Sequence, residues 1–338
     1  MSNFVRRLCP GIPDRFLAAL AVGLAYVVFL TIDQMHWWQL KPDYAFGWLV
    51  PVFVVYIVFD RWSRLQGFFA TAGPAALPGW LRRGLDLLAA LGLGGGLLLF
   101  VLGALYRAGA GSTQPGSLVL AGGFSGVLLG MIYFNVPAGR VGAAPPAPGW
   151  RGLRGDARLQ AVATFLFPAL IWMLSAPLLT AVENAISLAL LRKVVSVVFT
   201  VFSLLGYPLI QEGNVLVLPR GSVGVADACS GIRSLTACLF AGSFLAAVCL
   251  DRFWKKILLV LAAMILAFFT NLLRSLFLTG WAYAYGSEAI EGRLHDATGY
   301  AVMGLTVVGL LLLLPLFSDA NWRRWLALGP AEPATHAA

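Results

Sequence analysis

Eight long apolar stretches constrain the fold of this chain more than any other feature of its sequence. A helix needs about 20 mostly apolar residues to cross the hydrocarbon core of a bilayer, and inside that core only helices and closed barrels satisfy their backbone hydrogen bonds. The stretches cover residues 16–32, 44–59, 84–106, 117–135, 160–180, 231–250, 257–279 and 297–317. The sequence therefore predicts an all-α, polytopic membrane helix bundle with about eight transmembrane helices.

The charged residues exclude a soluble protein and a nucleic-acid partner. Only 12% of the residues are charged, against about 25% in soluble globular chains. The net charge is +9, but the basic residues are dispersed among short loops and not gathered on one domain, so we expect no nucleic-acid partner. The first apolar stretch follows Arg6, Arg7 and Arg15 without a small-x-small cleavage site after it, which indicates a retained first span and not a signal peptide.

The basic residues also predict the orientation in the membrane. With a cytoplasmic N-terminus, 16 of the 24 Lys and Arg residues fall in inside segments, as the positive-inside rule requires. These inside residues are Arg6, Arg7, Arg15, Arg61, Arg64, Arg82, Arg83, Arg140, Arg151, Arg154, Arg158, Arg252, Lys255, Lys256, Arg323 and Arg324. We therefore predict a multi-pass protein of the inner (cytoplasmic) membrane with both termini in the cytoplasm.

A ninth stretch, residues 183–206, is long enough to cross but carries Arg192 and Lys193 at its centre. Each basic side chain costs about 2.5–3.5 kcal/mol at mid-bilayer on insertion scales. A crossing here would also move the basic loop at 251–256 to the outside. We therefore expect 183–206 to form an interfacial or re-entrant helix.

The connecting segments contain no soluble domain of any size, so the sequence predicts a single integral membrane domain over residues 1–338. The segment 137–158 is rich in Pro, Gly and Arg and indicates a cytoplasmic linker. In 213–227, two apolar runs flank "PRG", which predicts a short extracytoplasmic β-hairpin. This hairpin leads directly into Cys229.

Polar residues gather at the outer ends of the last three predicted spans. Cys229 begins "CSGIRSL" before span six, Asn271 and Arg274 lie in "TNLLRSLFLTG" at the end of span seven, and His295 begins "HDATG" before span eight. In the predicted topology these three segments share the outer face of the membrane. A thiol, a guanidinium and an imidazole are therefore expected close to one another.

These residue types suit catalysis by a thiolate. A helix N-terminus and a nearby cation lower the pKa of a cysteine thiol and supply its nucleophilic form. Backbone N–H groups of the first helical turn, around Gly231 and Ile232 and next to the supporting residue Ser230, could donate to an oxyanion. His295 can exchange a proton near neutral pH, and Arg274 can bind a carbonyl or carboxylate oxygen. Asn271 shares a helix face with Arg274 and could orient it or a substrate amide.

The combination of "ACSGIRSL", "NLLR" and "HDATG", in this order on consecutive late spans, resembles the exosortase/archaeosortase family of membrane transpeptidases. The resemblance covers about residues 205–300, which would form the exosortase-like catalytic region. It implies Cys229 as the nucleophile, with Arg274 and His295 as its catalytic partners.

The resemblance also implies the reaction and the partners. Members of this family cleave C-terminal sorting signals, of the PEP-CTERM kind in bacteria, and transfer the new carboxyl end to an acceptor. The expected partners are thus exported proteins with a C-terminal motif, a transmembrane span and a basic tail, together with membrane lipid and an acceptor nucleophile that the sequence does not name. No metal-ligand spacing occurs, and we expect no cofactor.

Simpler interpretations remain open for each residue. Cys238 and Cys249 are expected to be packing residues in an apolar helix. Arg233 could tune Cys229 or pair with Asp227, and Asp296 could orient His295 or stabilise the N-terminus of span eight. An inert Cys229 would leave a transporter or lipid-binding protein in which Arg274 and His295 bind a passing anion. The same thiol could also serve an acyltransferase or a protease.

Overall fold

The structure is a computed structural model, and its helices divide into two compact units, Met1–Leu179 and Thr180–Ala338. It describes residues 11–70, 77–141, 152–153, 155–219, 221–224, 232–250 and 252–317. The prediction of a single integral domain is not tested by this division and stays a prediction. Each unit is described by itself below.

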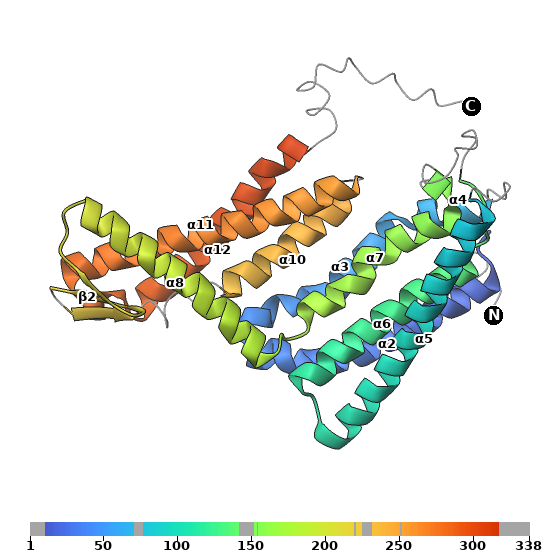
Figure 1. The fold of residues 1–338 in the computed structure, drawn as a ribbon, viewed down its shortest axis with the longest axis horizontal. Coiled ribbons are helices and arrows are strands. Elements are labelled where there is room, and N and C mark those ends of the chain that lie inside the picture. Colours follow the sequence, from blue (N-terminus) through green and yellow to red (C-terminus); the bar gives the residue numbers. More distant parts are fainter. Residues whose placement is uncertain are drawn as a thin grey trace, which may run out of the picture. The chain divides into compact units, whose positions relative to one another are not determined.

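All the elements that the structure describes in the first unit are helices (Figure 1). Its elements are α2 (Asp14–Leu40), the 3-10 helix η1 (Pro42–Leu49), α3 (Val50–Asp60), α4 (Trp62–Ala70), α5 (Gly79–Ala110), α6 (Gln114–Asn135) and α7 (Ala157–Ser175). α6 is the most buried of these helices, because α2, α5 and α7 all pack against it. The described ends of the predicted linker 137–158 pair in a single bridge between Arg140 and Asp156, and the rest of that linker lies largely outside the described residues.

Glycines join α5 and α6 at backbone distance. A Cβ atom added at Gly126 would lie 2.6 Å from the carbonyl oxygen of Gly92, and one added at Gly123 would lie 2.6 Å from the amide nitrogen of Phe100. Atoms this close leave no room for a side chain, so the two helix backbones are in direct contact. Small residues are the usual means of close helix packing in membranes.

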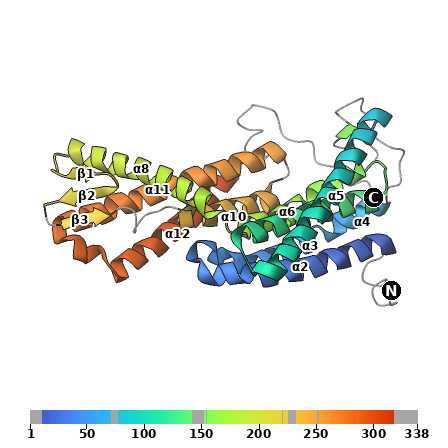
Figure 2. The same cartoon turned by 60° about the horizontal axis from the view of Figure 1, so that its bottom comes forward.

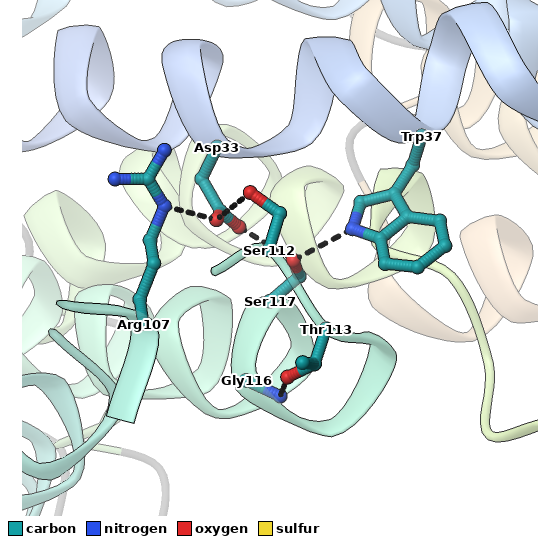
Figure 3. A network of polar contacts seen from close by, with 7 residues as sticks. All are labelled: Asp33, Trp37, Arg107, Ser112, Thr113, Gly116 and Ser117. Carbon is teal, nitrogen blue, oxygen red and sulfur yellow. Dashed lines mark hydrogen bonds and ion pairs between the residues drawn. The ribbon is translucent and has the colours of Figure 1, made fainter. Parts of the chain in front are cut away.

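A buried ion pair joins α2 to the α5–α6 hairpin (Figure 3). The side chain of Asp33 is 1% exposed, and Arg107 Nε donates to its Oδ1 at 2.6 Å. Ser112 Oγ donates to the same oxygen at 3.1 Å, and Ser117 Oγ donates to Oδ2 at 2.5 Å. Trp37 Nε1 in turn donates to Ser117 Oγ at 3.0 Å. Both carboxylate oxygens are therefore satisfied without water.

The second unit combines long helices with a small sheet (Figures 1 and 2). Its elements are α8 (Thr180–Leu204), β1 (Ile210–Glu212), β2 (Val215–Leu218), β3 (Gly221–Gly224), α10 (Ile232–Cys249), α11 (Phe253–Tyr285), the 3-10 helix η3 (Ser287–Ile290), α12 (Arg293–Leu313) and the 3-10 helix η4 (Leu314–Phe317). Its main hydrophobic cluster joins the second half of α8, the sheet and the C-terminal half of α11.

The sheet has one strand more than the predicted hairpin. β2 and β3 form that hairpin, with Leu216 opposite Val223, and β1 pairs antiparallel on the other side of β2. Glu212 lies opposite Val215, so the β1–β2 turn has only two residues, and its first residue, Gly213, has φ +62°. Glycine reaches this left-handed conformation without steric cost.

α8 is one continuous helix of 25 residues, and its length and composition make it a candidate span. Its buried side chains are Leu191, Val194, Val195, Val198 and Phe202. Arg192 and Lys193 are exposed at its centre on the opposite side. Because lipid-facing basic residues at mid-bilayer are costly, the interfacial position of 183–206 stays our prediction.

Eight helical segments among the described residues are long and apolar enough to cross a membrane, the number that the sequence predicts. The set differs in one member, since it includes α8 and leaves out α10, whose apolar part, Arg233–Cys249, is shorter. Most helices also extend beyond the predicted spans. α2, for example, continues to Leu40, because Asp33 and Gln34, which follow Ile32, are buried and hydrogen-bonded.

Candidate functional site

α11 carries the first half of the polar cluster. With 33 residues and a rise of 1.5 Å per residue, it is about 50 Å long, whereas the hydrocarbon core is about 30 Å thick. Arg274 stands 21 residues after Phe253, which places it about 32 Å along the helix. The helix therefore continues past Arg274, and this last part packs against α8, the sheet and η3.

Arg274 and His295 are brought together directly. Arg274 Nη2 lies 2.9 Å from His295 Nε2 and donates to the His295 carbonyl oxygen at 3.2 Å. His295 stands in the first turn of α12, and its side chain is 34% exposed. The two residues that the sequence places on different spans thus form one hydrogen-bonded pair.

This contact determines the tautomer of His295. A guanidinium has only donors and stays protonated, so Nε2 must accept the hydrogen bond from Arg274. A ring that accepts at Nε2 carries its proton on Nδ1. Nδ1 lies 3.5 Å from Asp296 Oδ1, whose side chain is 72% exposed.

Thr298 belongs to the same cluster, although the sequence analysis did not single it out. Its hydroxyl donates to the His295 carbonyl oxygen at 2.8 Å and accepts from Arg274 Nε at 3.4 Å. The guanidinium also lies against Gly299, where an added Cβ would be 3.6 Å from Nη2. Both residues belong to the "HDATG" segment. That motif is the sequence feature from which their place in the cluster could have been predicted.

The other candidate residues on α11 and α12 have distinct positions. Asn271 is buried on α11, and the backbone carbonyl of this residue accepts from Ser275 Oγ at 3.0 Å. The partners that orient Arg274 are Thr298 and His295, and among the described contacts none joins it to Asn271. Asp296 lies in the first turn of α12, but the N-cap residue is Gly292.

The cysteine segment lies outside the described residues. This applies to Cys229, Ser230 and Gly231, and also to Asp227, the alternative partner of Arg233. Arg233 itself is exposed at the start of α10. Of the two cysteines expected to be packing residues, Cys238 is buried and Cys249 is exposed at the end of α10. Their positions therefore agree with a packing role for Cys238 alone.

No group of three or more His, Cys, Asp or Glu side chains is placed to hold a metal ion in the part of the chain that the structure describes. The polar cluster consists of an arginine, a histidine and a threonine. Such a set can bind a carbonyl oxygen or an anion and exchange a proton, and it can do so without the ligand geometry of a metal centre.

The structure has apolar helices of spanning length, and reactive polar groups lie together at the ends of two of them. This combination is typical of a multi-pass membrane enzyme. Over residues 37–312, most of the chain, the sequence matches the family described as transmembrane exosortase (Exosortase_EpsH). The chain belongs to this family, and its activity is that of a membrane transpeptidase of the exosortase kind. Neither the comparison with curated proteins nor that with solved structures gave a match.

Proposed function

We propose that this protein is a cysteine transpeptidase that cleaves PEP-CTERM-like C-terminal sorting signals of exported proteins and transfers the new carboxyl end to an acceptor. Cys229 is the nucleophile, and Arg274 and His295 are its catalytic partners. Membership of the exosortase family supports the class of reaction. The single observation that supports the roles of the two partners is the contact of 2.9 Å between Arg274 Nη2 and His295 Nε2.

The reaction proceeds through a thioester. The Cys229 sulfur attacks the scissile carbonyl carbon as its proton passes to His295, and the carbonyl electron pair moves onto the oxygen, where Arg274 stabilises the negative charge. The C–N bond then breaks, and His295 returns the proton to the leaving amine. An acceptor nucleophile attacks the thioester and gives its proton to His295. Finally the C–S bond breaks, and the thiolate is reprotonated.

In this proposal the site lies at the outer face of the inner membrane, where exported substrates reach it. The substrate's own apolar span lies in the bilayer and its basic tail stays in the cytoplasm. The position of Arg274 about 32 Å along α11 supports this, because a helix that starts at the inner surface has then crossed about 30 Å of hydrocarbon.

Topology is the first expected result. Both termini and the loop at 251–256 should be cytoplasmic, because the basic residues are concentrated in those segments. Single cysteines introduced at these places into a Cys-free variant should react with a membrane-impermeant maleimide only after the membrane is opened. A loop at 251–256 that reacts in intact cells would place the Arg274–His295 pair on the wrong side for exported substrates.

Trapping of the acyl-enzyme tests the proposed function. Purified protein is mixed with a reporter that carries a PEP-CTERM-like motif, an apolar span and a basic tail, and the adduct is identified by mass spectrometry. Wild type should form a thioester at Cys229 that hydroxylamine cleaves. His295→Gln cannot carry a proton, so acylation should slow by about 10²–10⁴-fold. Arg274→Lys keeps the charge but loses the planar fork, and its adduct should diminish too.

Reporter binding provides the control for these variants. Both should still bind the reporter, because its apolar span docks in the bilayer away from the chemistry. If Cys229 forms no adduct while Arg274→Lys and His295→Gln leave processing intact, the transpeptidase mechanism is wrong, and a transporter with an inert Cys229 becomes the better hypothesis.

A further inference from the structure

We propose that Thr298 is a positioning residue that holds Arg274 in place while the guanidinium changes partner from His295 to the substrate oxygen. This inference rests on the proposed function and adds a step to it. It depends on three residues from two helices: the Arg274 side chain contacts the side chains of both Thr298 and His295, and the Thr298 hydroxyl contacts the His295 backbone carbonyl.

The hydrogen bond between Arg274 and His295 sets the order of events at the imidazole ring. Because Arg274 Nη2 donates to Nε2, the ring proton is on Nδ1, and Nε2 is the only ring nitrogen that can accept another proton. A proton that arrives from the Cys229 thiol must therefore displace Arg274 from Nε2. Proton uptake and release of the guanidinium are thus one event.

The released donor has a use at the same moment. When the thiol loses its proton and its sulfur attacks, negative charge develops on the substrate carbonyl oxygen, and a donor freed at that time can stabilise it. Arg274 on α11 and Asp296 on α12 are charged groups next to the His295 ring. Arg274 is the cation of the two, and so it is the one that can serve the oxyanion.

When Nη2 leaves both Nε2 and the His295 carbonyl oxygen to reach the substrate, Arg274 needs another contact to stay in place. Thr298 supplies this contact at a different nitrogen, because its hydroxyl accepts from Nε. The same hydroxyl is itself held, since it donates to the His295 carbonyl oxygen one turn earlier in α12. Nη2 can then turn toward the substrate while Nε stays in place.

The threonine hydroxyl is the essential group, and α12 offers a matched control. Thr306 lies on the same helix, where its hydroxyl bonds to the Val302 carbonyl oxygen at 2.7 Å and to Thr270 at 2.9 Å. It is eight residues, or about 12 Å, away from Thr298. Thr298→Val and Thr306→Val each replace a hydroxyl by a methyl group of similar size. Only Thr298→Val deletes a hydrogen-bond partner of Arg274.

The test compares kinetics of purified Thr298→Val, Thr298→Ser, Thr306→Val and Cys229→Ala with the PEP-CTERM-like reporter. Thr298→Val should lower kcat and the single-turnover rate of thioester formation by about 10–100-fold, as expected for a misplaced catalytic group, with little change in KM. Thr298→Ser keeps the hydroxyl and should retain most of the activity. Thr306→Val should leave kcat unchanged. Should Thr298→Val not be recovered from membranes, Thr298→Ala removes the same hydroxyl.

Each result separates the inference from the proposed function. Wild-type kcat in Thr298→Val, with Cys229→Ala inactive, would overturn the positioning role and leave the transpeptidase mechanism standing. Equal losses in Thr298→Val and Thr298→Ser, together with a lower melting temperature, would show that the threonine serves the fold only. Activity in Cys229→Ala would overturn both.

Discussion

Replacement of Cys229 by alanine is expected to abolish processing of the sorting signal with unchanged expression. The nucleophile forms the bond that every later step depends on, so kcat should fall by at least roughly 10³-fold, as in other enzymes that lose their nucleophile. Cys229→Ser should be nearly as inactive, because a hydroxyl does not ionise as a thiol does. The measurement is the gel shift of a PEP-CTERM-like reporter expressed beside each variant.

The other cysteines provide the matched controls. Cys238 is buried within α10 and Cys249 ends that helix, about 26 Å from its start. Cys238→Ala and Cys249→Ala should therefore process the reporter at the wild-type level. Full processing by Cys229→Ala would exclude the thioester mechanism, whereas loss in all three variants would point to a general effect on the fold.

The second large effect is expected at the Asp33–Arg107 ion pair, and it concerns stability. The Asp33 side chain is 1% exposed in the protein. Arg107→Ala removes its cationic partner and leaves the carboxylate with two hydroxyl donors, from Ser112 and Ser117. Removal of one partner of a buried ion pair typically costs about 3–5 kcal/mol, because the other charge stays buried and uncompensated. The detergent-purified variant should melt at a clearly lower temperature and be recovered in smaller amounts.

A double variant shows whether the buried charge is the cause. Asp33→Asn removes the charge, so Arg107→Ala combined with Asp33→Asn should be more stable than Arg107→Ala alone. Asp33→Asn alone should cost less than Arg107→Ala, because the Arg107 side chain is 27% exposed and can reach water. The explanation fails if the double variant is less stable than either single variant.

The same ion pair shows what the sequence could not predict about the fold. Hydropathy located seven of the eight candidate spans, because the apolar residues are local in sequence. It ended the first span at Ile32, before Asp33 and Gln34, although α2 continues to Leu40. The groups that satisfy Asp33 come from residues 107, 112 and 117, and no local pattern announces partners more than 70 residues away.

The candidate site was predictable where the chemistry of a single residue is distinctive. Arg274 can bind an anion and His295 can exchange a proton, and the structure brings them together. Thr298 was missed because threonine is common in membrane helices and its role depends on two contacts, one within α12 and one across to α11. The third strand, β1, was missed because only three residues form it.

The glycine contact between α5 and α6 bears on how the protein is made. Only three residues, Gly111–Thr113, connect the two helices, and the Thr113 side chain accepts from the Gly116 amide to begin α6. A contact this local closes with little loss of chain entropy. The hairpin can therefore pair as soon as both helices have left the translocon, while the rest of the chain is still being synthesised. Asp33 lies earlier in the chain and enters the bilayer before the hairpin does. The paired hairpin then brings Arg107 and Ser117, which lie at adjacent helix ends, to the Asp33 carboxylate together.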